Sequence, residues 1–147
     1  MITFTEKAYG EDTRKGANVD YVATLPFYLR QKSRLLITMD NGKEAAIRLG
    51  HGEKLNDGDV LTGELGLHLR IEAAPESVST AYANSFTLHA RACYHLGNRH
   101  VPLEIGDGYV RYQSDHVLDE MLKKLGLNVF SEYARFQPEP GAYSHHA

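Results

Sequence analysis

The stretch VPLEIGDGYVRY, residues 101–112, decides how the second half of this sequence is expected to fold. Apolar residues on both sides of Gly106-Asp107-Gly108 are typical of short strands, and the two glycines and the aspartate are typical of a tight turn. This stretch therefore predicts two strands, over residues 101–105 and 109–112, that are joined as a hairpin.

Helical patterns lie on both sides of this hairpin. Apolar residues recur with a helical period over residues 78–96, and the preceding Pro75-Glu76-Ser77 is typical of a helix start. Gly97-Asn98 is expected to end this helix, because both residues tolerate the left-handed conformation that caps helices. A second helix is predicted to begin at residues 114–115, which are good N-caps, and to end at Gly126.

Two further strands complete the pattern of the second half. The first is taken from residues 67–71 or their continuation, and the last is expected over residues 129–136. The predicted order is then β-α-β-β-α-β, which is the ferredoxin-like arrangement.

The first half of the chain carries a different pattern. Short apolar stretches alternate with turns that contain Gly and Asp, which is typical of a small barrel or sandwich. These strands are expected at residues 1–9, 21–27, 34–39, 45–49, 60–62 and 67–71. The composition changes at Ala73-Ala74-Pro75-Glu76, where we place a domain boundary.

We therefore predict an α+β fold with two domains. A small all-β N-terminal domain is expected over residues 1–74, and a ferredoxin-like C-terminal domain over residues 75–140. Residues 141–147 follow a segment rich in Pro and Gly and are expected to form a mobile tail.

Composition and charge exclude several classes of function. The 147 residues carry a formal net charge of −3, whereas binding of nucleic acid through bulk charge needs a basic excess. No apolar stretch approaches the roughly 20 residues of a membrane span, and the N-terminus lacks a secretion signal. The single Cys93 cannot form an internal disulfide. We expect a cytoplasmic protein that binds neither nucleic acid nor membranes.

Histidine is the unusual component of the second half. The chain has eight histidines, and imidazole is a preferred ligand of nickel, copper and zinc. In the stretch HLGNRH, His95 is expected in the last turn of the first helix and His100 just beyond its end. Both can be metal ligands, but a histidine at a helix C-terminus is also favoured by the helix dipole, so both interpretations remain open.

His89 and Cys93 are four residues apart and therefore share one face of the predicted helix. An imidazole and a thiolate at this spacing can bind zinc or copper. The same face, however, is expected to carry Tyr82, Phe86 and Leu96, and a free cysteine is usually a small buried apolar residue. The pattern favours core packing for this pair.

The remaining histidines are less informative. His116 follows Asp115, whose carboxylate can either cap the second helix or orient an imidazole that binds metal. His145 and His146 stand together near the C-terminus, where they can bind metal weakly or be a cloning remnant. The sequence contains no Gly-x-Ser-x-Gly elbow, no phosphate-binding glycine loop and no His-Glu-x-x-His motif.

Two of these motifs, taken together, resemble a known family. HLGNRHVPLEI at residues 95–105 and DHVL at residues 115–118 are closely similar to the UreE family of urease accessory proteins. The segment FQPEPGAY at residues 136–143 is similar as well, and QKSRL at 31–35 and NDGDVL at 56–61 fit loosely. The resemblance thus covers nearly the whole chain.

This resemblance implies a nickel metallochaperone and not an enzyme. It implies a β-rich N-terminal domain of peptide-binding type, and a homodimer in which His100 of both protomers shares one Ni(II) ion. His95 and His116 fall near that site, and His145 and His146 are expected to be auxiliary ligands. We expect that Zn(II) or Cu(II) can replace nickel in vitro. The implied partners are the urease apoprotein and other urease accessory proteins, including a GTPase.

The chain also departs from the family pattern. Some members carry another histidine where Ser114 stands, and many end in a long histidine-rich tail of which only His145-His146-Ala147 is present. The resemblance therefore implies the nickel site shared by two copies of His100, and fewer additional nickel sites than in family members with a long histidine-rich tail.

Two other functional classes are open at this level. A zinc-dependent hydrolase could use the same histidines, but it would need a positioned acid or base, for which Glu104 and Asp115 are the nearby candidates. The other class is a scaffold without metal, in which the β-rich domain binds a peptide.

Overall fold

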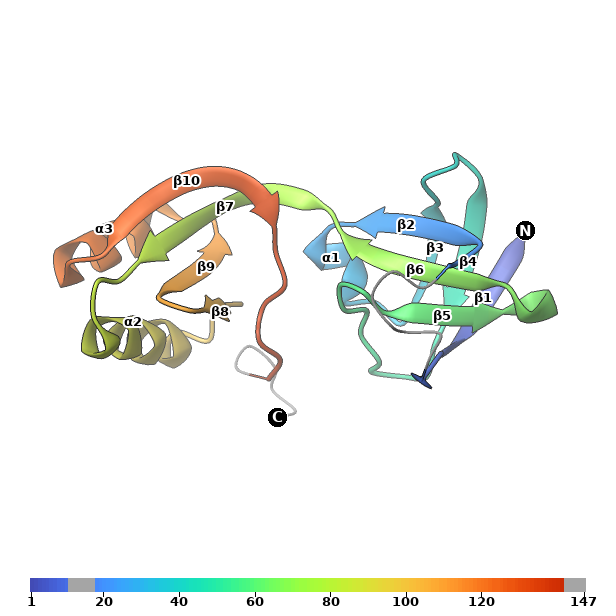
Figure 1. Cartoon of the computed structure of the whole chain (residues 1–147), viewed down its shortest axis with the longest axis horizontal. Helices are drawn as coiled ribbons and strands as arrows, with labels where there is room; N and C mark the ends of the chain where they lie inside the picture. Colours follow the sequence, from blue (N-terminus) through green and yellow to red (C-terminus); the bar gives the residue numbers. More distant parts are fainter. Residues whose placement is uncertain (11–17, 142–147) are drawn as a thin grey trace. The chain divides into compact units, whose positions relative to one another are not determined.

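The computed structural model describes residues 1–10 and 18–141 of the chain. The chain divides into two compact units, residues 1–74 and 75–147 (Figure 1). The first is built almost entirely of strands and the second of strands and helices, so the predicted α+β fold class is confirmed. In the described part, no helix is both long and apolar enough to cross a membrane.

The N-terminal unit is a six-stranded sheet with the order β2-β6-β5-β1-β4-β3. β1 pairs in parallel with β4, and β2 pairs in parallel with β6. Its buried core includes Phe4, Ile47, Leu61 and Ile71. The elements of this unit are β1 (Ile2–Lys7), β2 (Tyr21–Leu25), α1 (Phe27–Arg30), β3 (Arg34–Thr38), β4 (Glu44–Arg48), β5 (Val60–Gly63), η2 (Glu64–Gly66) and β6 (His68–Ala73).

One short helix replaces the end of a predicted strand. The strand expected over residues 21–27 stops at Leu25, and the turn of helix α1 follows Pro26. Proline lacks the N–H group that a sheet ladder needs, and its carbonyl accepts the N–H of Arg30 over 3.2 Å. The buried Arg30 side chain donates back to the Leu25 carbonyl over 3.0 Å, which fixes the turn.

Asp40 links the two outer strands of the N-terminal sheet. It follows β3, and its backbone N–H donates to the Val22 carbonyl of β2 over 2.9 Å. Its carboxylate accepts the backbone N–H of Thr24 at 3.0 Å and the hydroxyl of the same residue at 2.9 Å. The sheet edges are therefore joined to each other, which favours the barrel over the sandwich.

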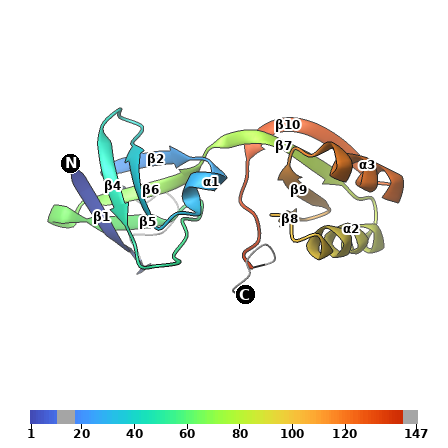
Figure 2. The ribbon, with the colours of Figure 1, turned by 180° about the vertical axis from the view of Figure 1, so that it is seen from behind.

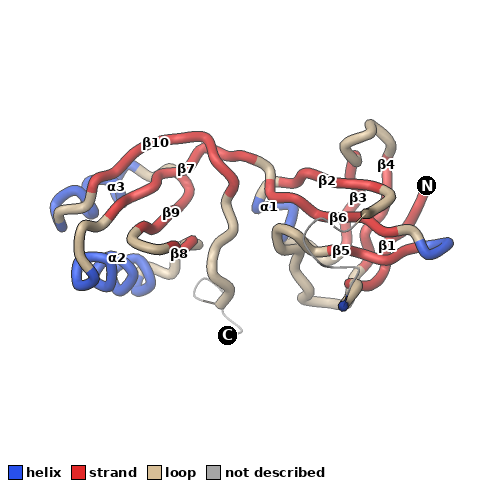
Figure 3. Tube along the Cα trace, in the orientation of Figure 1, coloured by secondary structure: helices blue, strands red, loops and turns tan. Residues whose placement is uncertain are grey.

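The C-terminal unit has the predicted order β-α-β-β-α-β (Figure 3). Its four-stranded sheet runs β10-β7-β9-β8, with antiparallel pairing throughout. The elements are β7 (Pro75–Tyr82), α2 (Phe86–Asn98), β8 (Glu104–Gly106), β9 (Tyr109–Gln113), α3 (His116–Leu125) and β10 (Asn128–Arg135). The predicted strand over residues 101–105 is shorter than expected and begins at Glu104.

The first helix was predicted too early in the chain. Residues 75–82 form β7, which pairs with β9 on one side and with β10 on the other, and α2 begins only at Phe86 after the N-cap Ser85. β7 is a central strand, and its consecutive residues Val78, Ser79, Thr80 and Ala81 are all buried, so both of its faces are covered and its burial does not alternate. The first strand of the C-terminal unit is therefore β7, whereas residues 68–73 form β6 of the N-terminal sheet.

The predicted end of this helix was also wrong. Gly97 and Asn98 are helical, and Arg99 is the C-cap with a right-handed conformation. The left-handed residue is His100, with φ of 55°. The second helix agrees with the prediction, because Asp115 is its N-cap and Gly126 its left-handed C-cap.

Both helices bury one face against the C-terminal sheet. Ala92 and Leu96 of α2 and Leu122 of α3 pack in one cluster with Val110 and Tyr112 of β9. Figure 2 shows this unit from the reverse side. Two aromatic residues assigned to the core by sequence are not there: Phe86 is 94% exposed and Tyr82 is 44% exposed.

Candidate metal site

His100 occupies the turn between α2 and β8, and its side chain is exposed. Its backbone N–H donates to the Gly97 carbonyl over 3.0 Å, and its φ of 55° lies in the left-handed region. Residues with a Cβ adopt this region at a cost of about 1–2 kcal/mol, and such positions cluster at functional sites. The fold therefore holds this imidazole outward in a conformation that glycine would adopt without strain.

His95 lies in the last turn of α2 and is exposed. Its ring meets the neighbouring Tyr94 ring edge to face, with 5.3 Å between centroids. A position in the last helical turn also suits a protonated imidazole, because the helix dipole is negative there. The local geometry of His95 is therefore compatible with a metal ligand and with a histidine that only stabilises the helix end.

His116 is the first residue of α3 and is also exposed. The preceding Asp115 accepts the backbone N–H of Leu118 at 3.1 Å through Oδ1, so this carboxylate acts as the helix cap. Helix capping alone accounts for an aspartate at position 115, so a role of this carboxylate in orienting a metal ligand is not needed to explain it.

A cavity of about 270 Å³ adjoins the segments that carry His100 and His116. Val101 and Pro102, which follow His100, line it together with Asp115, which precedes His116. The fold thus brings together the turn after α2 and the start of α3. In the sequence His100 precedes the hairpin of β8 and β9, and His116 follows it. Only the folded chain brings the two segments that carry them to the same cavity.

Within residues 1–10 and 18–141, no group of three or more His, Cys, Asp or Glu side chains is placed to hold a metal ion. His145 and His146 lie outside the described residues, as does the predicted tail beyond Gly141. The contribution of these two histidines stays a prediction.

His89 and Cys93 lie together on the inner side of α2. His89 Nε2 donates to the Tyr109 carbonyl over 3.0 Å, and Cys93 Sγ lies 4.0 Å from the same nitrogen. That nitrogen carries a proton when it donates, so its lone pair is not available to a metal. Burial raises the pKa of the Cys93 thiol, which packs against the helix–sheet core. These contacts favour the packing role.

Glu104 has fixed partners on both carboxylate oxygens. Oε1 accepts the backbone N–H of Gln137 at 2.8 Å, and Oε2 accepts the Tyr109 hydroxyl at 3.2 Å and Arg111 Nη1 at 3.3 Å. A general base needs an oxygen directed at the reacting water. The proposed hydrolase chemistry therefore receives no support from Glu104 or from Asp115. Sequence reasoning missed Arg111 and Gln137, which no motif marks.

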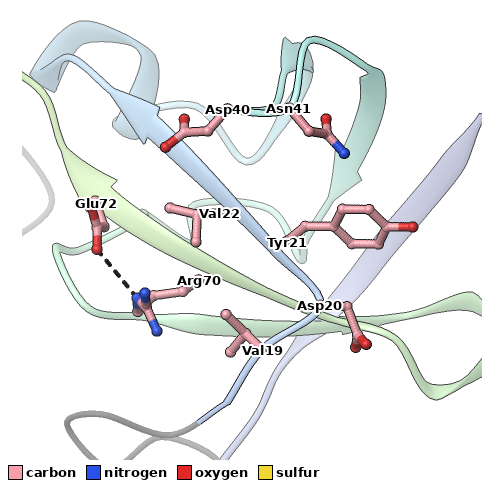
Figure 4. Close-up of a pocket in the computed structure, with 8 residues that line it drawn as sticks. All are labelled: Val19, Asp20, Tyr21, Val22, Asp40, Asn41, Arg70 and Glu72. Atoms are coloured by element: carbon pink, nitrogen blue, oxygen red, sulfur yellow. Dashed lines mark hydrogen bonds and ion pairs between the residues drawn. The ribbon is translucent and has the colours of Figure 1, made fainter.

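The N-terminal unit has a pocket of its own, with a volume of about 370 Å³ (Figure 4). Asp20 and Asp40 lie at its rim, and Arg70 pairs with Glu72 over 3.3 Å at its wall. The Asp20 carboxylate accepts the backbone N–H of His68 at 2.8 Å. Because the aspartates hold backbone groups in place, their presence is explained by the fold, and peptide binding by this domain stays a prediction.

The fold and site define a class of protein: a two-domain α+β protein whose ferredoxin-like unit presents exposed histidines at helix ends. Comparison with known sequences gives the family. Residues 76–147 match the model of the UreE urease accessory protein C-terminal domain, and residues 6–74 match that of the N-terminal domain. The chain belongs to the UreE urease accessory protein family.

Curated relatives agree with this assignment. The urease accessory protein UreE of Alkalilimnicola ehrlichii is 52% identical over 143 residues, which cover 97% of this chain and 85% of the relative. The protein of the same name from Vibrio parahaemolyticus is 48% identical, with 97% and 91% covered, and that of Pseudomonas putida is 49% identical, with 97% and 86% covered. The family resemblance is confirmed, and the family is one of accessory proteins and not of enzymes.

Proposed function

We propose that this protein is a nickel metallochaperone that takes part in urease maturation. In this proposal two copies form a homodimer and His100 of each copy binds one shared Ni(II) ion. His95 and His116 lie near this ion, and His145 and His146 act as auxiliary ligands. The observation that carries the proposal is the outward-held, left-handed His100 of a chain that belongs to the UreE family.

Symmetry supports the choice of His100. A two-fold axis brings the same residue of both protomers to one point, so a single side-chain type supplies two ligands. The described part of one chain gathers no group of three donors, and a second copy doubles the number of donors. An exposed residue next to a helix end can be approached by a second copy.

The same arrangement suits a carrier. Nickel(II) can take six ligands, so two imidazoles leave positions open for water, for tail histidines and for the receiving protein. A site with open positions exchanges its ion more readily than a closed four-ligand site. The order of affinities places copper above nickel, and we expect that Cu(II) or Zn(II) can occupy the site in vitro.

The partners follow from the family. We propose that the protein passes nickel to the urease apoprotein in the cytoplasm, together with other urease accessory proteins that include a GTPase. We propose that the N-terminal domain, which is of peptide-binding type, docks to one of these proteins. The zinc hydrolase is not retained, because both candidate carboxylates have structural partners.

The test is calorimetric titration of nickel into His100→Ala, with His51→Ala as the matched control. His51 is an exposed histidine of the N-terminal unit and is not one of the proposed ligands, so its replacement removes the same imidazole from outside the proposed ligand set. We expect His100→Ala to lose the tight nickel site and His51→Ala to keep it. Tight nickel binding by a folded His100→Ala protein would refute the proposal.

A further inference from the structure

Two arginines stand opposite each other on the hairpin of β3 and β4 (Figure 1). Arg34 of β3 and Arg48 of β4 are partners in the ladder, and both side chains are exposed. Within residues 1–10 and 18–141, neither arginine forms an ion pair. Glu44 is the only acidic residue of the two strands, and it lies four residues from Arg48, or about 13 Å along β4. The two positive charges are therefore not compensated.

The register of the ladder brings these arginines close together. The backbone N–H of Leu49 donates to the Ser33 carbonyl over 2.8 Å, so the next pair along the ladder, Arg34 and Arg48, has no hydrogen bonds between its backbones. In an antiparallel ladder the Cα atoms of such a pair are only about 4.5 Å apart. Like charges directly opposite each other destabilise a sheet, so the fold gives no reason for this pair.

The arginine pair adjoins an open sheet edge. β3 is the last strand in the order of its sheet, and its even-numbered residues direct their backbone groups away from β4. Within the described residues, the backbone N–H and C=O groups of Arg34 and Leu36 form no hydrogen bond. The link through Asp40 lies beyond the end of β3. The Leu36 side chain shares a face with Arg34 and is 71% exposed. This edge thus combines open backbone groups, an apolar side chain and two cations.

An extended acidic segment fits this combination. A strand that adds to an open sheet edge gains main-chain hydrogen bonds, and its alternate side chains meet those of the edge strand. A carboxylate opposite Arg34 would offset the repulsion from Arg48, and an apolar residue two positions further on would cover Leu36.

Two other occupants fit less well. A second copy of this chain would bring the same cations to the edge, and charged edges oppose such self-pairing. A long polyanion such as nucleic acid is repelled by the net charge of −3 on the chain. The charges therefore favour a short acidic segment of another protein.

We propose that the open edge of β3 is a docking site for an extended acidic segment of a partner protein. Arg34 and Arg48 bind its carboxylates, and Leu36 packs against its apolar side chains. This inference rests on the docking role proposed above for the N-terminal domain, and it specifies the surface and the chemistry of the partner.

The experiment is a fluorescence anisotropy titration of the full-length protein with a labelled peptide in which glutamate and valine alternate. Arg34→Ala and Arg48→Ala should each weaken binding by about fivefold, which is the upper range for an exposed ion pair. Lys43→Ala is the matched control, because Lys43 is an exposed cation in the turn of the same hairpin, and its affinity should equal that of the wild type. Added salt should weaken binding of the peptide.

Two further probes examine the form of the occupant. A peptide of the same composition, with glutamates and valines in separate blocks, should bind more weakly because it cannot match alternate side chains. Equal binding of the two peptides would overturn the proposal, as would wild-type affinity in Arg34→Ala and Arg48→Ala. Binding of anionic phospholipid vesicles or of single-stranded DNA, with no binding of the alternating peptide, would overturn it as well.

The variant Arg48→Glu separates binding from folding. It replaces a pair of like charges by a pair of opposite charges, so the unfolding temperature of the free protein should rise while peptide binding is lost. Retained peptide binding would overturn the proposal. An unchanged or lower unfolding temperature would contradict the repulsion from which the proposal is argued.

Amide hydrogen exchange on the wild type gives a test without any substitution. The Leu36 N–H should exchange fast in the free protein and slowly with the alternating peptide, whereas the Ile37 N–H, which bonds to β4, should be slow in both states. No change at Leu36 in the presence of bound peptide would overturn strand addition.

Nickel titration keeps this proposal separate from the nickel site. His100→Ala should bind the peptide as the wild type does, and Arg34→Ala should bind nickel as the wild type does. Absence of peptide binding, with tight nickel lost only in His100→Ala, would refute the docking site and leave the metallochaperone proposal intact.

Discussion

The backbone N–H of His100 bonds to the Gly97 carbonyl over 3.0 Å, and this bond turns the chain out of α2 with His100 in the left-handed region. The bond places an imidazole where a helix cap more often has glycine. The residue therefore combines a local conformational cost with a position at the surface. The effect of His100 on stability comes from its backbone conformation, whereas its proposed effect on metal binding comes from its exposed imidazole. Substitutions at this position can therefore measure the two effects separately.

The first prediction compares two replacements of His100. Both His100→Gly and His100→Ala should lose the tight nickel site, because both lack the imidazole. In metal-free protein His100→Gly should be more stable than His100→Ala by about 0.5–1 kcal/mol, because glycine adopts a positive φ without the clash of a Cβ. Urea unfolding of both variants measures the difference. Equal stability would mean that the turn relaxes when histidine is removed.

The second prediction concerns His89 and Cys93. Replacing either by alanine should lower the free energy of unfolding by about 0.5–2 kcal/mol, because each removes contacts between α2 and the sheet. Nickel stoichiometry should be unchanged. Thr87→Ala is the control on the exposed side of the same helix, and it should alter neither quantity. Loss of nickel in Cys93→Ala would assign the thiol to the metal site.

The third prediction is a loss of stability at high pH. Burial and the hydrogen bond to Asp119, which is 2.6 Å long, raise the pKa of Tyr112 far above the ordinary tyrosine value near 10. Above pH of about 10 the unfolded chain releases this proton and the folded one keeps it. Stability should then fall by up to about 1.4 kcal/mol per pH unit for this residue.

Thermal unfolding between pH 9 and 11 tests this expectation. Tyr112→Phe should be less stable than the wild type at neutral pH, because Asp119 loses its donor, and its stability should fall less steeply above pH of about 10. Tyr28 is an exposed tyrosine, so Tyr28→Phe should leave the slope unchanged. A wild-type slope in Tyr112→Phe would disprove the assignment.

The elements that sequence reasoning located well carry their own local signals. Helix α3 has an N-cap at Asp115 and a left-handed glycine at Gly126, and both are visible without tertiary information. β7 was mistaken for helix because its consecutive residues Val78, Ser79, Thr80 and Ala81 are all buried, so the segment lacks the alternation that marks a half-buried strand. Only pairing with β9 and β10 decides that segment.

For the candidate site, the sequence predicted the residues but not their conformation or their long-range contacts. The motif around His100 was visible in the sequence, whereas its left-handed conformation arises because α2 continues through Gly97 and Asn98. The contact of Glu104 with Gln137 joins residues 33 positions apart, and no local pattern announces it. Long-range hydrogen bonds to the backbone depend on the path of the chain and not on residue type alone.

The most direct test of the central claim is the nickel content of the wild-type protein at a known state of association. Analytical ultracentrifugation combined with metal analysis, after removal of weakly bound ions, gives the number of nickel ions per chain. A site shared by two copies of His100 predicts one tightly bound nickel ion per dimer. One tightly bound ion per chain, or nickel held by a monomer, would contradict the account.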